Sequence, residues 1–123
     1  MKVLVAEDDM IMLKTIEVRL KKDGYNVITA QDGKEALRKF EQQAPDLIIT
    51  DIMMPFMSGL EIVGAVKKQG GKDTPIIVLS TMGQENVVLE AFKLGADDFI
   101  TKPFSPKELS MRVQRYAQKM ENT

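Results

Sequence analysis

Five short, mainly apolar segments alternate along the chain with longer segments of helical periodicity, and this alternation limits the fold more than any other feature. The five segments, interpreted as β-strands, are Lys2–Ala6, Tyr25–Ala30, Asp46–Asp51, Pro75–Ser80 and Asp98–Thr101. Parallel strands need crossover connections, and right-handed crossovers through helices cover both faces of a sheet. The sequence therefore predicts an α/β fold in which a doubly wound parallel sheet of five strands is covered by five helices.

The segments between the predicted strands have apolar residues three or four positions apart, as amphipathic helices do. The expected inward-facing residues are Leu13, Ile16 and Leu20 in the first helix, Ala36, Leu37 and Phe40 in the second, Leu60, Val63 and Val66 in the third, and Leu109, Val113, Tyr116 and Met120 in the last. The fourth helix is expected over Gln84–Leu94, with Gly95 just beyond its end. Gly24 and Gly70-Gly71 indicate the ends of the first and third helices, and Ser105-Pro106 indicates the start of the last.

The composition excludes several kinds of site. The chain has no cysteine and no histidine, which rules out disulfides, thiolate nucleophiles, sulfur-ligated metals and histidine bases. Its 17 basic and 18 acidic residues give a net charge of −1, which does not favour direct nucleic-acid binding through a broad basic face. No apolar run approaches the roughly 20 residues of a membrane helix, and no signal peptide is recognisable. We therefore expect one cytoplasmic domain over residues 1–123, with proteins as partners.

The segment Asp46–Pro55 is the centre of the predicted site. Its apolar residues indicate a fully buried strand that ends at the carboxylate of Asp51, and Pro55 indicates a loop after it. In doubly wound sheets, ligands bind outside the carboxyl ends of the strands. At that edge the sequence places Glu7 and Asp8 after the first strand, Asp51 after the third, Ser80 after the fourth and Lys102 after the fifth.

Each of these residues also has an ordinary structural explanation. An aspartate after a strand commonly turns the chain, as Asp51 could do, and Glu7 or Asp9 could cap the first helix. Ser80 could complete a strand end, and Lys102 could be a solvated charge at the rim. An acidic pair, a further carboxylate, a hydroxyl and an ammonium at one rim are harder to explain by turn chemistry alone.

Three carboxylates in one cleft repel each other, so one must take up a proton or a cation must lie between them. With oxygen ligands alone, Mg²⁺ or Mn²⁺ is the expected ion, held by a few carboxylates and several waters. A phosphoryl group arriving at Asp51 would be stabilised by the metal, by the Lys102 ammonium and by the Ser80 hydroxyl. Asp51 would then be the nucleophile that forms an acyl phosphate.

On these residues the chain resembles the receiver domains of bacterial two-component response regulators over essentially its whole length. Glu7 and Asp8 match the family's acidic pair, Asp51 its phosphoacceptor, Ser80 its switch hydroxyl, Phe99 its switch aromatic residue and Lys102 its lysine. The resemblance implies the flavodoxin-like strand order 2-1-3-4-5 and a cis bond between Lys102 and Pro103. It also implies that Asp8, Asp51 and the backbone carbonyl of Met53 ligate Mg²⁺, with Glu7 acting through water.

The resemblance further implies a signalling role in which the domain catalyses only its own phosphorylation and dephosphorylation. A sensor histidine kinase or a phosphotransfer protein would supply the phosphoryl group, since the chain has no histidine of its own. As Ser80 moves toward that group, Phe99 would fill the vacated volume. The face made by the fourth helix, the fifth strand and the last helix would then change its interaction with an output domain or effector protein.

Residues 95–104 and the last helix are similar to receivers of the winged-helix transcription-factor subclass, which dimerise through this face by ion pairs. A phosphorylation-dependent homodimer could draw its ion pairs from Lys93, Asp97, Asp98, Glu108 and Arg112. Val88, however, stands where that subclass commonly has a basic residue. Solvated surface charge explains the same residues equally well.

Three residues near the site bear on its access and its kinetics. Thr81 follows Ser80 where the family usually has alanine, so the phosphoryl group should still fit but with tighter access. Met53 and Met82, two residues beyond Asp51 and Ser80 respectively, occupy positions that in this family influence hydrolysis of the acyl phosphate. Neither side chain carries a charge that could orient an attacking water, so slow self-dephosphorylation is expected.

Three other functions share part of this pattern. A phosphohydrolase with an aspartyl nucleophile would need a second aspartate two residues later, where the chain has Met53. A nucleotide- or flavin-binding module would need a glycine-rich turn after the first strand, where the chain has Ala6-Glu7-Asp8-Asp9. A receiver that serves only as a scaffold is disfavoured by the intact set of site residues.

Overall fold

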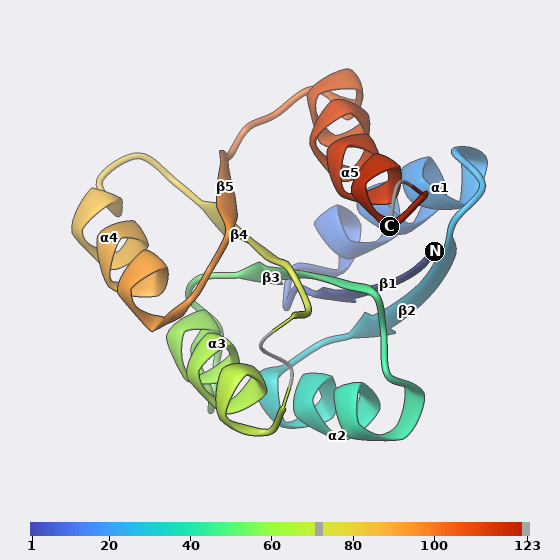
Figure 1. Ribbon diagram of the computed structural model, residues 1–123. Helices are drawn as coiled ribbons and strands as arrows, with labels where there is room; N and C mark the ends of the chain where they lie inside the picture. Colours follow the sequence, from blue (N-terminus) through green and yellow to red (C-terminus); the bar gives the residue numbers. More distant parts are fainter. Residues whose placement is uncertain (71–72, 122–123) are drawn as a thin grey trace.

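The computed structural model, which describes residues 1–70 and 73–121, has a central parallel sheet between two layers of helices (Figure 1). The strands are β1 (Lys2–Ala6), β2 (Asn26–Ala30), β3 (Leu47–Asp51), β4 (Ile76–Ser80) and β5 (Asp98–Thr101). They are ordered β2-β1-β3-β4-β5, and all neighbouring pairs are parallel. The predicted fold class and strand order are therefore confirmed. Because the order reverses between β1 and β3, the carboxyl ends of these two strands flank the place where such sheets bind ligands.

Within residues 1–70 and 73–121, five helices connect and cover the strands. They are α1 (Met10–Lys22), α2 (Gly33–Gln43), α3 (Gly59–Lys68), α4 (Glu85–Leu94) and α5 (Pro106–Glu121). Helices α1 and α5 cover one face of the sheet, and α2, α3 and α4 cover the other (Figure 1). In the described parts of the chain, no helix has the length and apolar character needed to cross a bilayer.

The alternation of side chains along the buried strands divides the apolar core into two clusters. In β3, Ile48 joins the cluster under α2, α3 and α4, whereas Leu47 and Ile49 join the cluster under α1 and α5. All three are fully buried, and burial of such a side chain contributes about 1.5–3 kcal/mol relative to exposure. Since both faces of β3 are covered, the strand holds Asp51 at its end in a fixed position.

The helix boundaries follow the local signals in the sequence. Asp9 caps α1 by accepting hydrogen bonds from the backbone N–H groups of Ile11 and Met12, and the Ser105 hydroxyl accepts one from the N–H of Glu108 in α5. Gly24, Gly70 and Gly95 follow α1, α3 and α4 with φ angles of 97°, 88° and 118°. Glycine is favoured at such positions because it has no Cβ. Gly71, which was expected to share the end of α3, lies outside the described residues.

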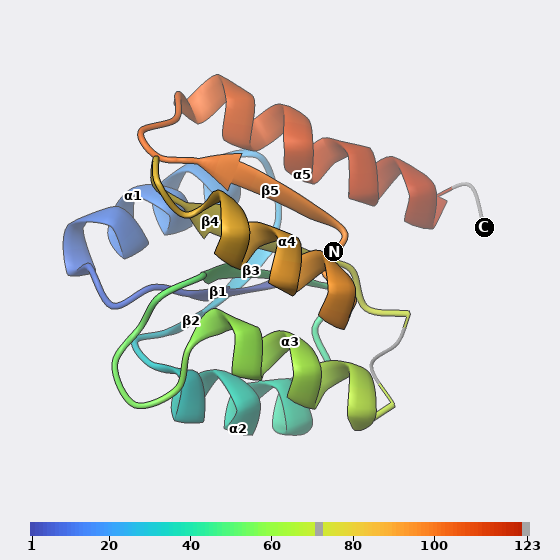
Figure 2. The ribbon, with the colours of Figure 1, turned by 90° about the vertical axis from the view of Figure 1, so that its left-hand side faces the viewer.

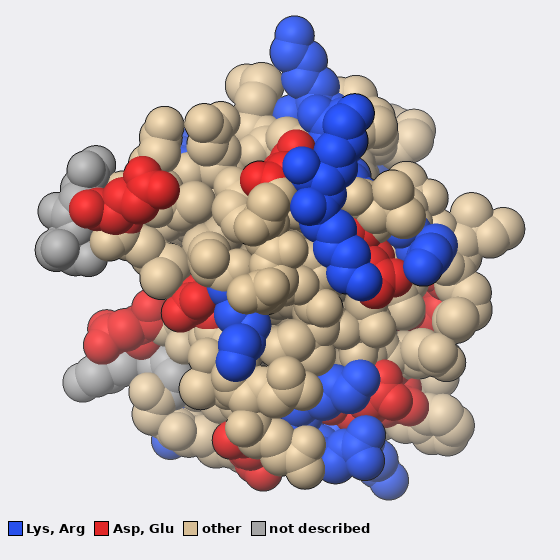
Figure 3. All heavy atoms as spheres, turned by 90° about the vertical axis from the view of Figure 1, so that its right-hand side faces the viewer, with Lys and Arg blue, Asp and Glu red and all other residues tan. Residues whose placement is uncertain are grey.

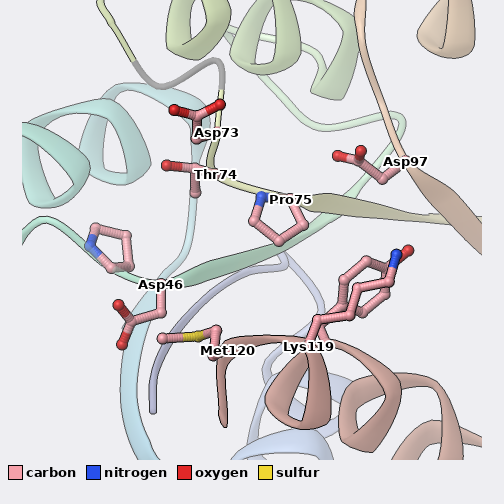
Figure 4. Close-up of a pocket in the computed structure, with 9 residues that line it drawn as sticks. Asp46, Asp73, Thr74, Pro75, Asp97, Lys119 and Met120 are labelled. Carbon is pink, nitrogen blue, oxygen red and sulfur yellow. The ribbon is translucent and has the colours of Figure 1, made fainter. Parts of the chain in front are cut away.

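The predicted buried stripe of α5 is wrong at Met120. Leu109, Val113 and Tyr116 are buried, but Met120 is 44% exposed. The helix is longer than the strands it covers, and its last turn extends past the amino ends of the strands (Figure 2). Met120 therefore lines a surface hollow of about 510 Å³ at that edge, which also contains Pro75 and Asp97 (Figure 4).

Candidate functional site

The carboxyl ends of the strands meet at one edge of the sheet, on the left in Figure 2, and the loops that follow them carry the predicted site residues. Asp51 is the last residue of β3, and Ser80 is the last residue of β4. Glu7 and Asp8 directly follow β1, and Lys102 directly follows β5. The shared edge follows from parallel pairing, because parallel strands all end on the same side.

Three carboxylates come together at this edge. Glu7, Asp8 and Asp51 each offer one oxygen atom, and these atoms lie within 4.8 Å of one another. Their surroundings differ: Glu7 is 1% exposed, the Asp51 side chain is 13% exposed, and Asp8 is open to solvent. The group is therefore buried at Glu7 and open to solvent at Asp8. Its oxygen donors suit a hard divalent cation.

Lys102 supplies the positive charge of the site. Its Nζ donates a hydrogen bond to Glu7 Oε2 at 2.9 Å and lies 3.4 Å from Asp51 Oδ2. The backbone N–H of Lys102 donates to the carbonyl oxygen of Ser80 at 2.6 Å, which fixes the start of the loop against β4. The Lys102–Pro103 peptide bond is cis, as the family resemblance implied.

Burial and charge set the protonation behaviour of these groups. Burial raises the pKa of Glu7, and the hydrogen bond from Lys102 offsets this only in part. Burial also raises the pKa of Asp51 against the attraction of Lys102. For Lys102, burial would lower the pKa, but the hydrogen bond to Glu7 and the charge of Asp51 outweigh it, so the pKa is raised. With three carboxylates and one ammonium when all are ionised, the site carries excess negative charge that a cation would neutralise.

The loop after Asp51 is anchored by backbone contacts that the sequence did not single out. The N–H of Ile52 donates to the carbonyl oxygen of Leu79 at 2.9 Å, and the N–H of Gly59 donates to that of Ile52 at 3.0 Å. A Cβ on Gly59 would lie 2.8 Å from the Cα of Ile52 and would also strike the carbonyl oxygen of Asp51. Gly59 was not among the predicted site residues, because sequence spacing does not reveal so close a backbone approach.

Ser80 and Phe99 line one hollow of about 430 Å³ between β4, α4 and β5. Ser80 is 3% exposed, whereas Phe99 is 38% exposed. The ring of Phe99 meets that of Phe92 edge to face, with centroids 6.1 Å apart. Phe92 was not predicted as a partner of Phe99. The hollow is large enough to accept an aromatic side chain.

Four of the five charged residues considered for a dimer, Lys93, Asp97, Asp98 and Arg112, are engaged within the chain. Arg112 donates a hydrogen bond to Asp98 Oδ1 at 2.8 Å, and Lys67 lies 3.7 Å from Asp97. Lys93 lies 3.6 Å from Glu90, its neighbour on α4. Val88 is buried, so it contributes to the core rather than to a surface.

Comparisons with known proteins agree with this geometry. A family model described as the response regulator receiver domain matches residues 3–114. The chain is 44% identical over 113 residues to the probable transcriptional regulator ycf27 of Guillardia theta, covering 92% of this chain and 44% of that protein. It is 39% identical over 120 residues to the alkaline phosphatase synthesis transcriptional regulatory protein PhoP of Bacillus subtilis, covering 98% of this chain and 50% of that protein. The chain thus spans about half the length of these curated relatives.

Solved structures of response regulators also resemble this chain. The chemotaxis response regulator CheY4 of Vibrio cholerae superimposes with a TM-score of 0.88 at 39% identity, covering 94% of this chain and 97% of that chain. A response regulator receiver domain protein from Clostridium thermocellum superimposes with a TM-score of 0.90 at 31% identity, covering 98% and 96%.

Proposed function

The chain belongs to the response regulator receiver family, and from this premise we propose that it accepts a phosphoryl group on Asp51 in a Mg²⁺-dependent reaction and passes the signal on through a change of surface. One observation carries the proposal. The carboxylates of Glu7, Asp8 and Asp51 lie within 4.8 Å of one another, and the Lys102 ammonium lies 3.4 Å from Asp51. A nucleophile, a cation site and a fixed positive charge are what phosphoryl transfer to a carboxylate needs.

The donor set fits Mg²⁺, with Mn²⁺ as an alternative. Asp8, Asp51 and the backbone carbonyl of Met53 would hold the ion, and Glu7 would act through water. The fit rests on chemistry: the three side chains offer only oxygen, and burial raises the pKa of Glu7 and of Asp51. When bound, the ion supplies positive charge that offsets the negative charge of a transferring phosphoryl group.

The residues of the chain perform the transfer itself. A carboxylate oxygen of Asp51 attacks phosphorus, and the bond between phosphorus and the donor breaks, with its electron pair leaving on the donor. Lys102 and the Ser80 hydroxyl stabilise the phosphoryl oxygens in the transition state and in the product. Since the chain has no histidine, the proposed donor is a phosphohistidine of a sensor kinase or a phosphotransfer protein.

A surface beside the site has the character that a protein donor would require. On α1, Ile11 is 81% exposed and Val18 is 55% exposed. Both line a hollow with Lys14 and Arg19. Figure 3 displays the side of the molecule on which α1 lies in Figure 1, and Lys and Arg side chains form a band across it. Exposed aliphatic residues with a basic border favour a partner that presents an apolar face flanked by acidic residues.

The signal would leave through the face formed by α4, β5 and α5. In the proposed switch, the Ser80 hydroxyl turns toward the phosphoryl group, and Phe99 moves from its half-exposed position into the hollow beside Ser80. That movement would alter the contact of Phe99 with Phe92, which lines the same hollow, and would change the outer surface of α4. An output domain or effector protein would detect this change.

Incubation with Mg²⁺ and acetyl phosphate, followed by intact mass measurement, tests the proposal. The wild-type chain should gain the mass of one phosphoryl group, and removal of Mg²⁺ by a chelator should prevent the gain. Asp51→Asn should gain none, whereas the control Asp73→Asn, which alters an exposed aspartate outside the acidic cluster, should behave as wild type. Equal uptake by wild type and Asp51→Asn would contradict the proposal.

A further inference from the structure

We propose that the side-chain sulfur atoms of Met53 and Met82 form a peroxide-sensitive modification site, and that their oxidation to sulfoxides shortens the lifetime of the phosphoryl group on Asp51. The inference rests on the proposed function, because it concerns the group that Asp51 accepts. It adds an oxidant as a second signal, beside phosphorylation, that acts on the same site.

The composition directs oxidation to methionine. The chain contains nine methionines but no cysteine, tryptophan or histidine. The thioether sulfur is therefore the most readily oxidised side-chain atom available, and its exposure decides how fast it reacts.

Exposure separates these two methionines from their neighbours. Met82 is 85% exposed and Met53 is 53% exposed. Met54 and Met57 belong to the same loop as Met53, but both pack against the core cluster under α2, α3 and α4. The loop therefore presents one thioether to solvent and shields two, which gives an internal comparison of reactivity.

Met53 and Met82 belong to the loops that follow β3 and β4, at the edge of the sheet that carries the site (Figure 2). Met53 is two residues beyond Asp51, and its backbone N–H lies near enough to the Asp51 carboxyl group to offset part of the rise that burial causes in the pKa of that group. Met82 lines the hollow that contains Ser80 and Phe99. A change of polarity at Met53 therefore falls in the loop next to the nucleophile, and one at Met82 falls at the hollow that holds the switch residues.

The oxidation step is a two-electron transfer of oxygen. A sulfur lone pair attacks one oxygen of hydrogen peroxide, the O–O bond breaks, and the second oxygen leaves as water after taking up the proton of the first. Sulfur is oxidised to the sulfoxide, and the peroxide is reduced to water.

The product differs from the thioether in hydrogen bonding. A thioether is a weak acceptor, whereas the sulfoxide is polar and has an oxygen that can accept a hydrogen bond from water. A water held in this way is oriented for attack on the acyl phosphate, which the unmodified thioether cannot achieve. A gain of one hydrogen bond in the transition state corresponds to an increase in hydrolysis rate of about two- to tenfold.

The experiment uses hydrogen peroxide as the probe. The protein is treated, quenched, and mapped by peptide mass, then phosphorylated with acetyl phosphate and Mg²⁺ and freed of donor. Met53 and Met82 should oxidise before Met54 and Met57, and the phosphoryl half-life should fall by about threefold. Treatment with methionine sulfoxide reductases should restore the original half-life.

Two variants locate the effect. In the double variant Met53→Leu/Met82→Leu, the half-life of the phosphoryl group is measured before and after peroxide treatment. The treatment should not change it. Met111→Leu is the matched control, because Met111 is 61% exposed on α5 and its loss should leave the peroxide effect intact. If the double variant does not fold, wild-type species with zero, one and two added oxygens are separated, peptide mapping assigns the oxygens to residues, and the half-lives of species oxidised at Met53 or Met82 are compared with that of species oxidised at Met111.

Several results would overturn the proposal. These are oxidation of Met53 and Met82 no faster than that of Met54 and Met57, an unchanged half-life after both have been oxidised, or an equal shortening in the double variant. If the untreated protein takes up no phosphoryl group, the proposed function fails and this inference fails with it. The oxidation map distinguishes that outcome, since it is obtained without phosphorylation.

Discussion

The Lys102 ammonium lies 2.9 Å from the Glu7 carboxylate and 3.4 Å from that of Asp51, so its shorter contact is with the acid that is almost fully buried. A buried carboxylate is costly unless a cation accompanies it. Lys102 therefore stabilises the fold through Glu7 as well as serving the phosphoryl group at Asp51.

Removal of the ammonium should destabilise the protein by about 3 kcal/mol at pH 7 in the absence of metal, because Lys102→Met leaves Glu7 without its cation. The pKa of Glu7, which burial already raises, should then rise further. A carboxyl group with a raised pKa favours the folded state below its unfolded pKa, and this contribution is lost as pH rises through its folded pKa. The defect should therefore be smaller at pH 5 than at pH 7, as urea denaturation would measure.

Adding Glu7→Gln to Lys102→Met should restore most of the lost free energy of unfolding, because no uncompensated charge remains. The control Lys107→Met alters an exposed lysine and should change stability little. A double variant no more stable than Lys102→Met would show that the Glu7 pair does not cause the defect.

Mg²⁺ should stabilise the wild-type protein, by about 2.7 kcal/mol at a hundredfold excess over its Kd. Asp8→Asn should remove much of this gain, since it deletes one oxygen donor of the cluster, whereas Glu90→Gln on α4 should not. Protons compete with the metal for Glu7 and Asp51, whose pKa values burial raises. Calorimetric titration should therefore show weaker binding as pH falls, and affinity that did not depend on pH would contradict this account.

Gly59→Ala should destabilise the protein by about 1–3 kcal/mol and reduce phosphoryl uptake, because the added methyl group would displace the backbone at Asp51 and Ile52. Gly64, in the same helix, has open space where its Cβ would lie. Gly64→Ala should instead stabilise the protein by about 0.5–1 kcal/mol. Thermal unfolding of both variants checks the pair, and equal effects would contradict the close packing at Gly59.

Burial, together with the charges of Asp98 and Asp97, raises the pKa of Tyr116 to about 12. Because this folded value exceeds the ordinary value of 10.0, the associated stability is complete below pH 10 and is lost as pH rises toward 12. The chain has two tyrosines and no tryptophan, so Tyr25→Phe isolates the phenolate absorbance of Tyr116. Titration at high pH should show ionisation well above pH 10 while circular dichroism remains native. A midpoint near 10 in the folded protein would be the contrary result.

The sequence was sufficient for the fold and for the edge on which the site residues lie, because both follow from rules of chain connection. Parallel strands joined by helices end at one edge, so the sequence alone assigns Asp51, Ser80 and Lys102 to a common rim. Some observed strands begin one residue later than predicted, for local reasons. The N–H of Tyr25, for example, donates to the carbonyl oxygen of Leu20 at the end of α1 rather than to a strand.

The features that the sequence did not reveal depend on how far a side chain reaches and on the length of a helix relative to the sheet beneath it. It did not predict that the shorter contact of Lys102 would be with Glu7, because two carboxylates stand within reach of one flexible side chain. It placed Met120 in the core because helical periodicity does not show where the sheet beneath the helix ends. The edge-to-face contact of Phe92 with Phe99 likewise joins two elements whose relative orientation no sequence spacing gives.

Chemical trapping of the phosphorylated protein tests the central claim most directly. After reaction with acetyl phosphate and Mg²⁺, borohydride reduces an aspartyl phosphate to homoserine, and peptide mass mapping locates the reduced residue. The account predicts homoserine at position 51 alone, with none formed when Mg²⁺ is withheld. Homoserine at Asp8 or at another acidic residue, with position 51 unchanged, would contradict it.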